Sequence, residues 1–149
     1  MIEILRTDSS NSDFKQLVSL LDEELRIRDG ADNTFYAQFN KIDLIKNAII
    51  AYQDNIPIAC GAFKFYMDKT VEIKRMFVLN DYRGKGIARE VLHGLERWAA
   101  ELGFDTAVLE TGKRQPEAIR LYEKEGYARI PNYGQYKNID NSVCMKIKL

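Results

Sequence analysis

The apolar residues of the first fifty positions change from a strand-like to a helix-like pattern. Residues 2–6 predict a short strand, and the following segment has apolar residues three or four positions apart, which is typical of one helix face. Ser12 or Asp13 is a candidate N-cap, and Gly30 is the expected end of this helix. A second, weaker helical pattern covers residues 35–47. The apolar residues of the two patterns are Phe14, Leu17, Val18, Leu21 and Leu25, and then Phe35, Phe39, Ile42 and Ile45.

Three strand patterns follow one another closely in the middle of the chain. They cover residues 48–52, 58–66 and 71–79, and short polar turns at 53–55 and 67–69 separate them. Connections this short join antiparallel neighbours. We therefore expect a three-stranded meander.

Helices and strands alternate in the C-terminal half. The expected elements are a helix over 87–102, a strand over 106–110, a helix over 116–124 and strands over 126–130 and 143–148. The full order, β-α-α-β-β-β-α-β-α-β-β, predicts a single α+β domain over residues 1–149. Its sheet should be mixed, mostly antiparallel and twisted, with about seven strands and about four helices around it.

Composition and charge narrow the function further. The chain has 149 residues, of which 46% are hydrophobic and 30% charged, within the normal range for one globular domain. The formal net charge is zero, so no basic field predicts binding to nucleic acid or to an anionic membrane. Residues 1–70 carry 8 Lys/Arg against 11 Asp/Glu, and residues 71–149 carry 14 against 11. An anionic ligand is therefore expected in the second half.

The cysteines and the N-terminus exclude other classes. Cys60 and Cys144 form no CxxC pair and predict neither a metal site nor a disulfide framework. The first residues lack the basic start and apolar core of a signal peptide, and no apolar run approaches the ~20 residues of a membrane span. We expect a cytoplasmic protein whose cysteines pack in the sheet.

A glycine-bearing loop over 83–88 lies between an apolar strand and an amphipathic helix. Its glycines leave backbone N–H groups unshielded, and the first helical turn adds unpaired donors and a partial positive charge. The segment predicts an anion cradle for a phosphate or pyrophosphate, or else a plain helix entry. The dinucleotide pattern GxGxxG fails because Arg89 stands at its third glycine. The ATP-binding P-loop fails because no GK[ST] occurs.

Three segments together resemble the GNAT superfamily of acyl-CoA-dependent N-acyltransferases. The family's phosphate loop follows R/Q-x-x-G-x-G/A, and Arg83, Gly86 and Ala88 occupy its defined positions. Residues 72–78 resemble the family's fourth strand, and residues 116–127 resemble its fourth helix and the turn after it. The resemblance implies the GNAT fold and acetyl-CoA as cosubstrate, without a metal. It implies direct acetyl transfer to a primary amine of a small molecule or peptide.

The resemblance also implies which residues bind acetyl-CoA. In the family, backbone N–H groups of the loop hold the CoA pyrophosphate, and the fourth strand pairs with the pantetheine arm. The matching loop residues are Arg83, Gly84, Lys85, Gly86, Ile87, Ala88 and Arg89, and the matching strand residues are Met76, Phe77 and Val78. The Val78 amide is a candidate oxyanion donor. Gln115 stands where the family usually has a cofactor-binding Asn.

Tyr122 matches the family's tyrosine near the CoA sulfur. Acetyl transfer expels a thiolate, and a phenol with a pKa near ~10 can protonate it. The alternative is a buried aromatic residue that only packs on its helix, beside Leu121 and Ala118.

Glu72 is the candidate general base, acting on the attacking ammonium directly or through a water molecule. The alternative is a structural carboxylate paired with Lys74 or Arg75. Strict alternation would put Glu72, Lys74, Met76 and Val78 on one face of the strand, which mixes charged and apolar residues. A β-bulge, common in this strand of the family, would relieve the conflict.

The acceptor and the oligomeric state are less determined. Residues 8–32 contain seven acids against three bases, which suits a cationic amine or else forms a solvated helix face. Residues 133–136 are a candidate wall of the acceptor pocket, and His93 is expected to pack on its helix. The family also permits a homodimer, or a non-catalytic module that binds acyl-CoA as a sensor or for interaction.

Overall fold

The computed structural model describes residues 1–30 and 44–149, and its centre is a seven-stranded sheet in the order β1-β2-β3-β4-β5-β7-β6. Only β4 and β5 pair in parallel, and all other pairs are antiparallel. The strands are β1 (Ile2–Thr7), β2 (Asn47–Gln53), β3 (Ile56–Met67), β4 (Thr70–Val78), β5 (Thr106–Gly112), β6 (Ala128–Ile130) and β7 (Ser142–Lys148). This confirms the predicted mixed, mostly antiparallel α+β sheet.

Three α-helices and two short 3-10 turns are present among the described residues. They are α1 (Ser12–Asp29), α3 (Ile87–Glu101) and α4 (Pro116–Lys124), with η2 (Asn80–Tyr82) and η3 (Gly134–Tyr136). The predicted helical stretch over 35–47 lies mostly outside the described residues. Its described end is not helical, because residues 44–46 are irregular and Asn47 begins β2. Over the described ranges, no helix is both long and apolar enough to span a membrane.

The N-cap of α1 lies one residue before the first of the two predicted candidates. Asn11, rather than Ser12 or Asp13, is the N-cap, and its side-chain oxygen accepts hydrogen bonds from the backbone N–H groups of Asp13 and Phe14. An asparagine amide oxygen reaches these donors as well as a serine hydroxyl does. The prediction of the cap was wrong, but the helix and its end at Gly30 are confirmed.

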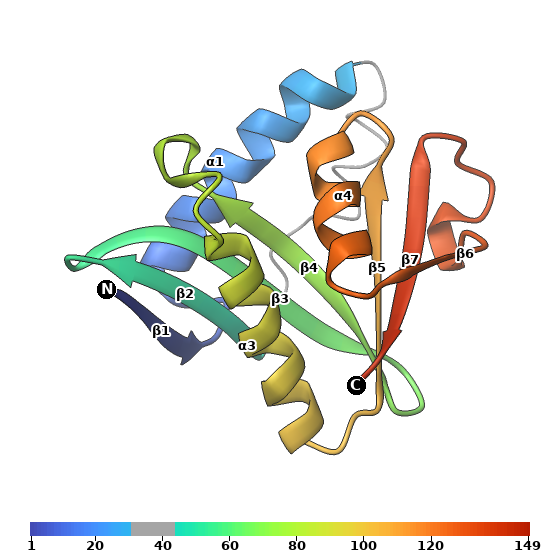
Figure 1. Ribbon diagram of the computed structural model, residues 1–149, viewed down its shortest axis with the longest axis horizontal. Coiled ribbons are helices and arrows are strands. Elements are labelled where there is room, and N and C mark those ends of the chain that lie inside the picture. The colour runs from blue at the N-terminus through green and yellow to red at the C-terminus, as the bar shows by residue number, and fades with distance from the viewer. Residues whose placement is uncertain (31–43) are drawn as a thin grey trace.

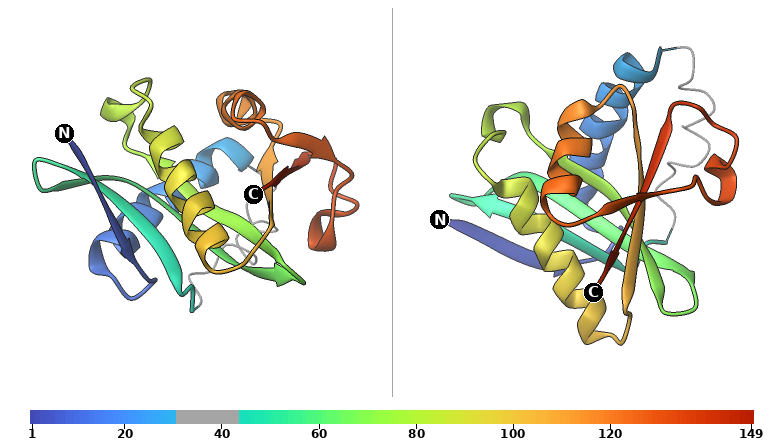
Figure 2. Two further views of the ribbon diagram at one scale, coloured as in Figure 1. Left: turned by 60° about the horizontal axis from the view of Figure 1, so that its bottom comes forward. Right: turned by 45° about the vertical axis from the view of Figure 1, so that its right-hand side comes forward.

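The sheet separates two apolar clusters, and Figures 1 and 2 show helices on both of its faces. Helix α1 packs on one face, where Phe14 and Leu17 contact a cluster that includes Ile50 and Phe77. Helices α3 and α4 cover the opposite face, over a larger core. That core includes Ile49, Phe63, Val71, Ile73, Val78, Val91, Leu92, Leu95, Leu109, Ile119 and Tyr122.

A β-bulge in β4 confirms the expectation for this strand. The β3–β4 register pairs Ala62 with Lys74 and then Cys60 with Phe77, so two β4 residues lie opposite Gly61. One of the two, Arg75, has a φ of 62°, which a non-glycine residue adopts only under local constraint. The extra residue shifts the alternation of side chains between the two faces of the sheet.

The shifted alternation resolves the mixed face expected for this strand. Before the bulge, Val71 and Ile73 belong to the core under α3 and α4, so Glu72 and Lys74 point to the α1 face. After it, Val78 lies in the core under α3 and α4 and Phe77 in the α1 layer. Glu72 and Lys74 therefore do not share a face with Met76 and Val78.

Strands β4 and β5 separate beyond the bulge. They pair only from Thr70 with Thr106 to Ile73 with Leu109, whereas β5 continues alongside β7 as far as Gly112. Figure 1 shows β4 turning away from β5, with α4 lying over the divergence. In the part of the chain that the structure describes, the last residues of β4 therefore have no β-partner on this side, which leaves outward N–H groups such as that of Val78 for a ligand.

Candidate active site

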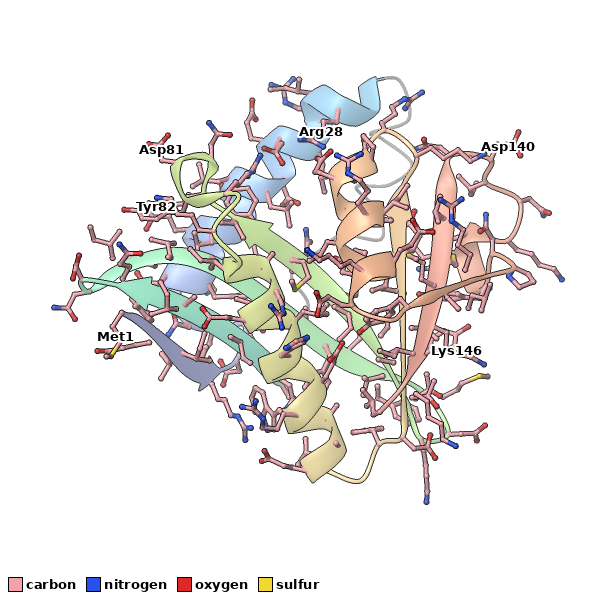
Figure 3. All side chains as sticks on the ribbon, in the orientation of Figure 1. Met1, Arg28, Asp81, Tyr82, Asp140 and Lys146 are labelled. Carbon is pink, nitrogen blue, oxygen red and sulfur yellow. The ribbon has the colours of Figure 1, made fainter. Side chains whose placement is uncertain are left out.

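A groove of about 360 Å³ runs along the separated end of β4. The loop after β4, the first turn of α3 and the first two turns of α4 form its other walls. Eleven of the twelve predicted cofactor residues line it: Met76, Phe77, Val78, Arg83, Gly84, Gly86, Ile87, Ala88, Arg89, Gln115 and Tyr122. Lys85 does not line the groove, and its Nζ lies 5.6 Å from the centre of the Tyr82 ring. Figure 3 shows Asp81 and Tyr82 on this loop.

The glycine loop has the geometry of an anion cradle. Gly84 and Gly86 have φ values of 78° and 80°, a conformation that only glycine adopts without strain. Gly86 is the N-cap of α3 and contributes no side-chain cap, so N–H donors of the first turn are left for a ligand. A Cβ on either glycine would meet open space, and both glycines line the groove. These features fit a bound diphosphate.

The backbone of Val78 faces the groove. The N–H of Leu79 donates to the Ile58 carbonyl on β3, and alternation turns the groups of Val78 and Met76 the opposite way. In agreement, the Val78 carbonyl accepts a 2.8 Å hydrogen bond from Arg83 Nε. The predicted oxyanion donor, the Val78 amide, therefore points into the separation between β4 and β5.

Ion pairs link α1 to both sides of the groove. Arg83 Nη2 donates to Glu24 Oε1 at 2.7 Å, and Arg28 pairs with Glu117 in the first turn of α4. Figure 3 shows Arg28 near the end of α1, on the side of α4. Asp22 pairs with Arg75 in the same way. Asp22 and Glu24, two of the seven acids predicted to attract a cationic amine or to form a solvated face, are therefore paired with arginines.

A second cavity of about 120 Å³ adjoins the groove. The two are adjacent, because both are lined by Leu21, Met76, Gln115, Ala118 and Tyr122. The charged residues that line the second cavity are Glu72, Lys74, Arg75 and Glu110, and Tyr136 contributes to its wall. Of residues 133–136, predicted as a wall of the acceptor pocket, Tyr136 lines this cavity.

Tyr122 lies where the two spaces meet. Its side chain is 7% exposed, and its ring contacts Tyr127 edge to face with centroids 5.7 Å apart. The Tyr127 hydroxyl in turn donates to Glu96 Oε2 at 2.7 Å. Burial, together with the negative charge of Glu110, raises the pKa of Tyr122 above its ordinary value. The phenol is therefore protonated at neutral pH and able to donate.

Glu72 is buried, with 3% exposure, in the second cavity. Its Oε2 accepts a 2.7 Å hydrogen bond from the Tyr133 hydroxyl, and its Oε1 lies 3.9 Å from Lys74 Nζ. Burial lowers the pKa of Lys74, which the Glu72 charge partly opposes. The structure thus gives Glu72 the predicted Lys74 contact and also a place beside Tyr122 in the same cavity.

Arg75 has a place in the site that the sequence does not predict. The sequence offers it only as a partner of Glu72, whereas its Nη1 donates to Asp22 Oδ1 at 2.7 Å. The side chain is 2% exposed, and its Nε and Nη2 have no hydrogen-bond partner within residues 1–30 and 44–149. A buried donor left unsatisfied costs about 1–3 kcal/mol. The signal in the sequence was an arginine inside a strand of otherwise buried residues.

Glu110 was not predicted at all. It follows the buried residues 107–109 of β5, lines the second cavity and accepts a 2.7 Å hydrogen bond from the Ser142 hydroxyl. Only the separation of β4 from β5 opens this position to a ligand. The sequence pattern of β5 gives no sign of that separation.

Other reactive side chains lie outside the site. His93 Nε2 lies 2.7 Å from Glu125 Oε1, so the histidine joins α3 to the end of α4, as expected of a packing residue. Cys60 and Cys144 are buried in the sheet, as predicted. Burial raises the pKa of Cys60 to about 12 and that of Cys144 to about 11. Both remain thiols at neutral pH.

The family comparison covers most of the chain. The model of the Acetyltransferase (GNAT) family matches residues 14–127. The match includes the glycine loop, the bulged strand and Tyr122. The chain belongs to the GNAT acetyltransferase family.

Curated relatives are N-acetyltransferases by name. An IAA acetyltransferase of Azospirillum brasilense is 35% identical over 89 residues, which are 59% of this chain and 58% of that protein. The uncharacterized N-acetyltransferase YsnE of Bacillus subtilis (strain 168) is 32% identical over 101 residues, 66% of this chain and 67% of that protein. The chain thus spans less than two thirds of the length of the first of these relatives.

Solved structures share the fold. A candidate acyl-CoA N-acyltransferase of Klebsiella pneumoniae has a TM-score of 0.83 at 24% identity, covering 100% of this chain and 98% of that one. PaiA N-acetyltransferase of Thermoplasma acidophilum, in complex with coenzyme A, has a TM-score of 0.73 at 18% identity, covering 100% and 99%. A GNAT acetyltransferase of Elizabethkingia anophelis with acetyl-CoA bound has a TM-score of 0.71 at 17% identity, covering 99% and 98%. At these identities the likeness shows the fold alone.

Proposed function

We propose that this protein is an acetyl-CoA-dependent N-acetyltransferase that moves the acetyl group directly to a primary amine of a small molecule or peptide. The observation that carries the proposal is that two adjacent spaces share Tyr122 in their walls. One is a groove with an anion cradle, and the other is a cavity lined by a buried carboxylate. The family membership and the names of the relatives support acyl transfer.

The proposed binding mode places acetyl-CoA along the groove. Backbone N–H groups of the loop and of the first turn of α3 hold the pyrophosphate, and Arg89 adds positive charge beside it. The outward backbone groups of Met76 pair with the pantetheine arm, and the Val78 amide faces the thioester at its end. Gln115 lines both spaces and offers its amide to the same arm. The CoA and acetyl-CoA complexes of the Thermoplasma and Elizabethkingia proteins support such use of the fold.

The proposed chemistry needs three proton transfers. Glu72 takes a proton from the ammonium of the acceptor, directly or through a water molecule, and the amine nitrogen then attacks the thioester carbon. The Val78 amide stabilises the oxyanion. The C–N bond forms and the C–S bond breaks, and the departing thiolate takes a proton from Tyr122. The acylated nitrogen then loses its second proton, which restores the Tyr122 phenol. The products are an N-acetylated acceptor and free CoA.

Direct transfer is favoured over an acetyl-enzyme intermediate. Nucleophilic catalysis by cysteine needs the thiolate, and the buried Cys60 and Cys144 have pKa values raised to about 12 and about 11. Neither cysteine lines the groove or the adjoining cavity. The acceptor amine itself is therefore the nucleophile.

The test is to incubate the pure protein with acetyl-CoA and a panel of amines while recording thiol release and product mass. The panel spans amino acids, polyamines, aminoglycosides and short peptides, and Tyr122→Phe is the matched inactive control. Acetylated product from the wild type, reduced in the variant, supports the proposal. Tight acetyl-CoA binding without transfer to any amine contradicts it and favours a non-catalytic acyl-CoA-binding module.

A further inference from the structure

The second cavity contains an unsatisfied cation. Arg75 is almost fully buried, and among the described residues only its Nη1 has a partner, the Asp22 carboxylate. Its Nε and Nη2 are buried without a hydrogen bond among the described residues. These two atoms lie along one edge of the planar guanidinium, and that edge can bind a carboxylate through two parallel hydrogen bonds. This cavity-lining arginine therefore has one carboxylate-binding edge without a hydrogen-bond partner in residues 1–30 and 44–149.

The neighbouring acids do not fill this edge. Glu72 accepts from Tyr133 and lies near Lys74 rather than Arg75. Glu110 accepts from Ser142. The positive φ of Arg75 belongs to the bulge, which brings Arg75 to the α1 side of β4 and places it in this cavity. The bulge thus presents a buried cation beside the catalytic candidates.

The open edge does not serve the CoA phosphates. The groove that contains the glycine loop is not lined by Arg75, whereas Arg83, Gly86 and Arg89 line it. Arg75 lines only the adjoining cavity, together with Glu72 and Glu110. An anion bound by Arg75 therefore comes from the second substrate.

We propose that the acceptor amine carries a carboxylate, and that Arg75 binds this carboxylate through Nε and Nη2. This inference rests on the proposed acetyl transfer and names its substrate class, a small amino acid. The cavity pairs the cations Arg75 and Lys74 with the carboxylates Glu72 and Glu110, which suits a zwitterion. The carboxylate is held by Arg75 while the ammonium is presented to Glu72. The volume of about 120 Å³ suits a small molecule.

The test compares acceptors that differ only at the carboxylate. Amino acids with small and medium side chains are each paired with their carboxamide, and kcat/KM is measured for both. The amine of a carboxamide is less basic, so more of it is neutral at pH 7, and greater amine reactivity cannot explain a preference for the acid. We expect the acid to be preferred about ten- to a hundredfold, the range of one charge-assisted pair.

Variants of Arg75 test whether this residue is the source of the preference. Arg75→Gln removes the charge, so the ratio of kcat/KM for the acid to kcat/KM for the carboxamide should fall close to one. Arg75→Lys keeps the charge without the two parallel donors, so its ratio should be intermediate. Arg26→Gln, at an exposed arginine paired with Glu23, is the matched control and should keep the wild-type ratio. Equal rates on acid and carboxamide in the wild type, or an unchanged ratio in both Arg75 variants, overturn the proposal. If Arg75→Gln does not fold, the proposal is decided by the ratio of acid to carboxamide in the wild type and in Arg75→Lys.

A binding measurement separates this proposal from the acetyl-transfer proposal. N-acetylated amino acids and their carboxamides are titrated by calorimetry into the wild type and Arg75→Lys, each saturated with CoA. Tighter binding of the acid to the wild type, weakened in the variant, supports the carboxylate site even if no amine is acetylated. Equal binding of acid and carboxamide overturns the site even if acetyl transfer is found.

Discussion

The Tyr133 hydroxyl donates a 2.7 Å hydrogen bond to Glu72 Oε2, joining the turn before β7 to the middle of β4. The Tyr133 ring also contacts Tyr66 and Tyr136, with centroids 5.1 and 5.9 Å apart. Burial and the Glu72 charge raise the pKa of Tyr133, so its hydroxyl remains a donor at neutral pH. Tyr133 therefore fixes the orientation of the carboxylate that we propose as the base.

Tyr133→Phe is expected to weaken acetyl transfer without weakening acetyl-CoA binding. The ring contacts remain, but the carboxylate loses the donor that orients it, a loss of about 1 kcal/mol or roughly fivefold. Kinetics with a saturating acceptor should show a lower kcat and an unchanged KM for acetyl-CoA. A raised KM for acetyl-CoA with unchanged kcat would assign Tyr133 to the cofactor groove instead.

Tyr122→Phe is expected to lower kcat about a hundredfold or more, the usual contribution of a general acid. Acetyl-CoA affinity, measured by calorimetry, should change little because the ring still packs on Tyr127. The matched control is Tyr52→Phe, which removes a hydroxyl that bonds Asp13 outside the site. Equal turnover in Tyr122→Phe and wild type would contradict the proposed acid.

The pH profile of the wild type gives a separate test of Tyr122. Because burial raises the pKa of this phenol above its ordinary value, it stays protonated through the range in which the amine loses its proton. Activity should therefore rise with pH up to about pH 10 as the neutral amine increases, without a falling limb. A profile of kcat/KM from pH 6 to 10 measures this. A decline between pH 8 and 9 would contradict the assignment.

Gly86→Glu is expected to weaken acetyl-CoA binding beyond any loss that follows from a less stable fold. The substitution forces a side chain into a φ of 80° and places a carboxylate in the phosphate cradle. Gly103→Glu is the matched control, because its φ of 94° imposes a similar strain on an open surface outside the groove. Calorimetry should show at least tenfold weaker binding for Gly86→Glu only. Equal losses in both variants would mean that the loop acts through the fold alone.

Local signals made much of this architecture predictable from the sequence. Residues 116–124 form a helix with the predicted bounds, because Pro116 suits a first turn and the apolar residues keep helical spacing. The turn at residues 53–55 contains Asp54 and Asn55 with φ values of 52° and 65°, which these residue types tolerate. The glycine loop was found because its residue types are tied to its backbone conformation.

The charged contacts of the site were not predictable, because they depend on tertiary structure. Asp22 and Arg75 come from α1 and a bulge in β4, and only the packing of that helix on the sheet brings them together. The bulge also decides which face receives Met76, and a period-two pattern cannot locate it. The place of Glu110 in the site was not predictable either, because Glu110 lines a cavity that exists where β4 separates from β5.

Glu96 gives the pH dependence of stability a defined sign. Its half-buried carboxylate accepts a hydrogen bond from the Tyr127 hydroxyl. Burial raises the pKa of Glu96 above the ordinary value. In the window between the two pKa values, the folded protein binds more protons than the unfolded chain. Stability should therefore fall as pH rises through this window and then level off.

Glu96→Gln keeps the acceptor for Tyr127 without the charge, so its thermal midpoint should exceed that of the wild type at pH 7 and vary less with pH. Glu90→Gln, at an exposed position of the same helix, is the matched control. A lower midpoint for Glu96→Gln at pH 7 would mean that the charge of Glu96 stabilises the packing of α3 against Tyr127.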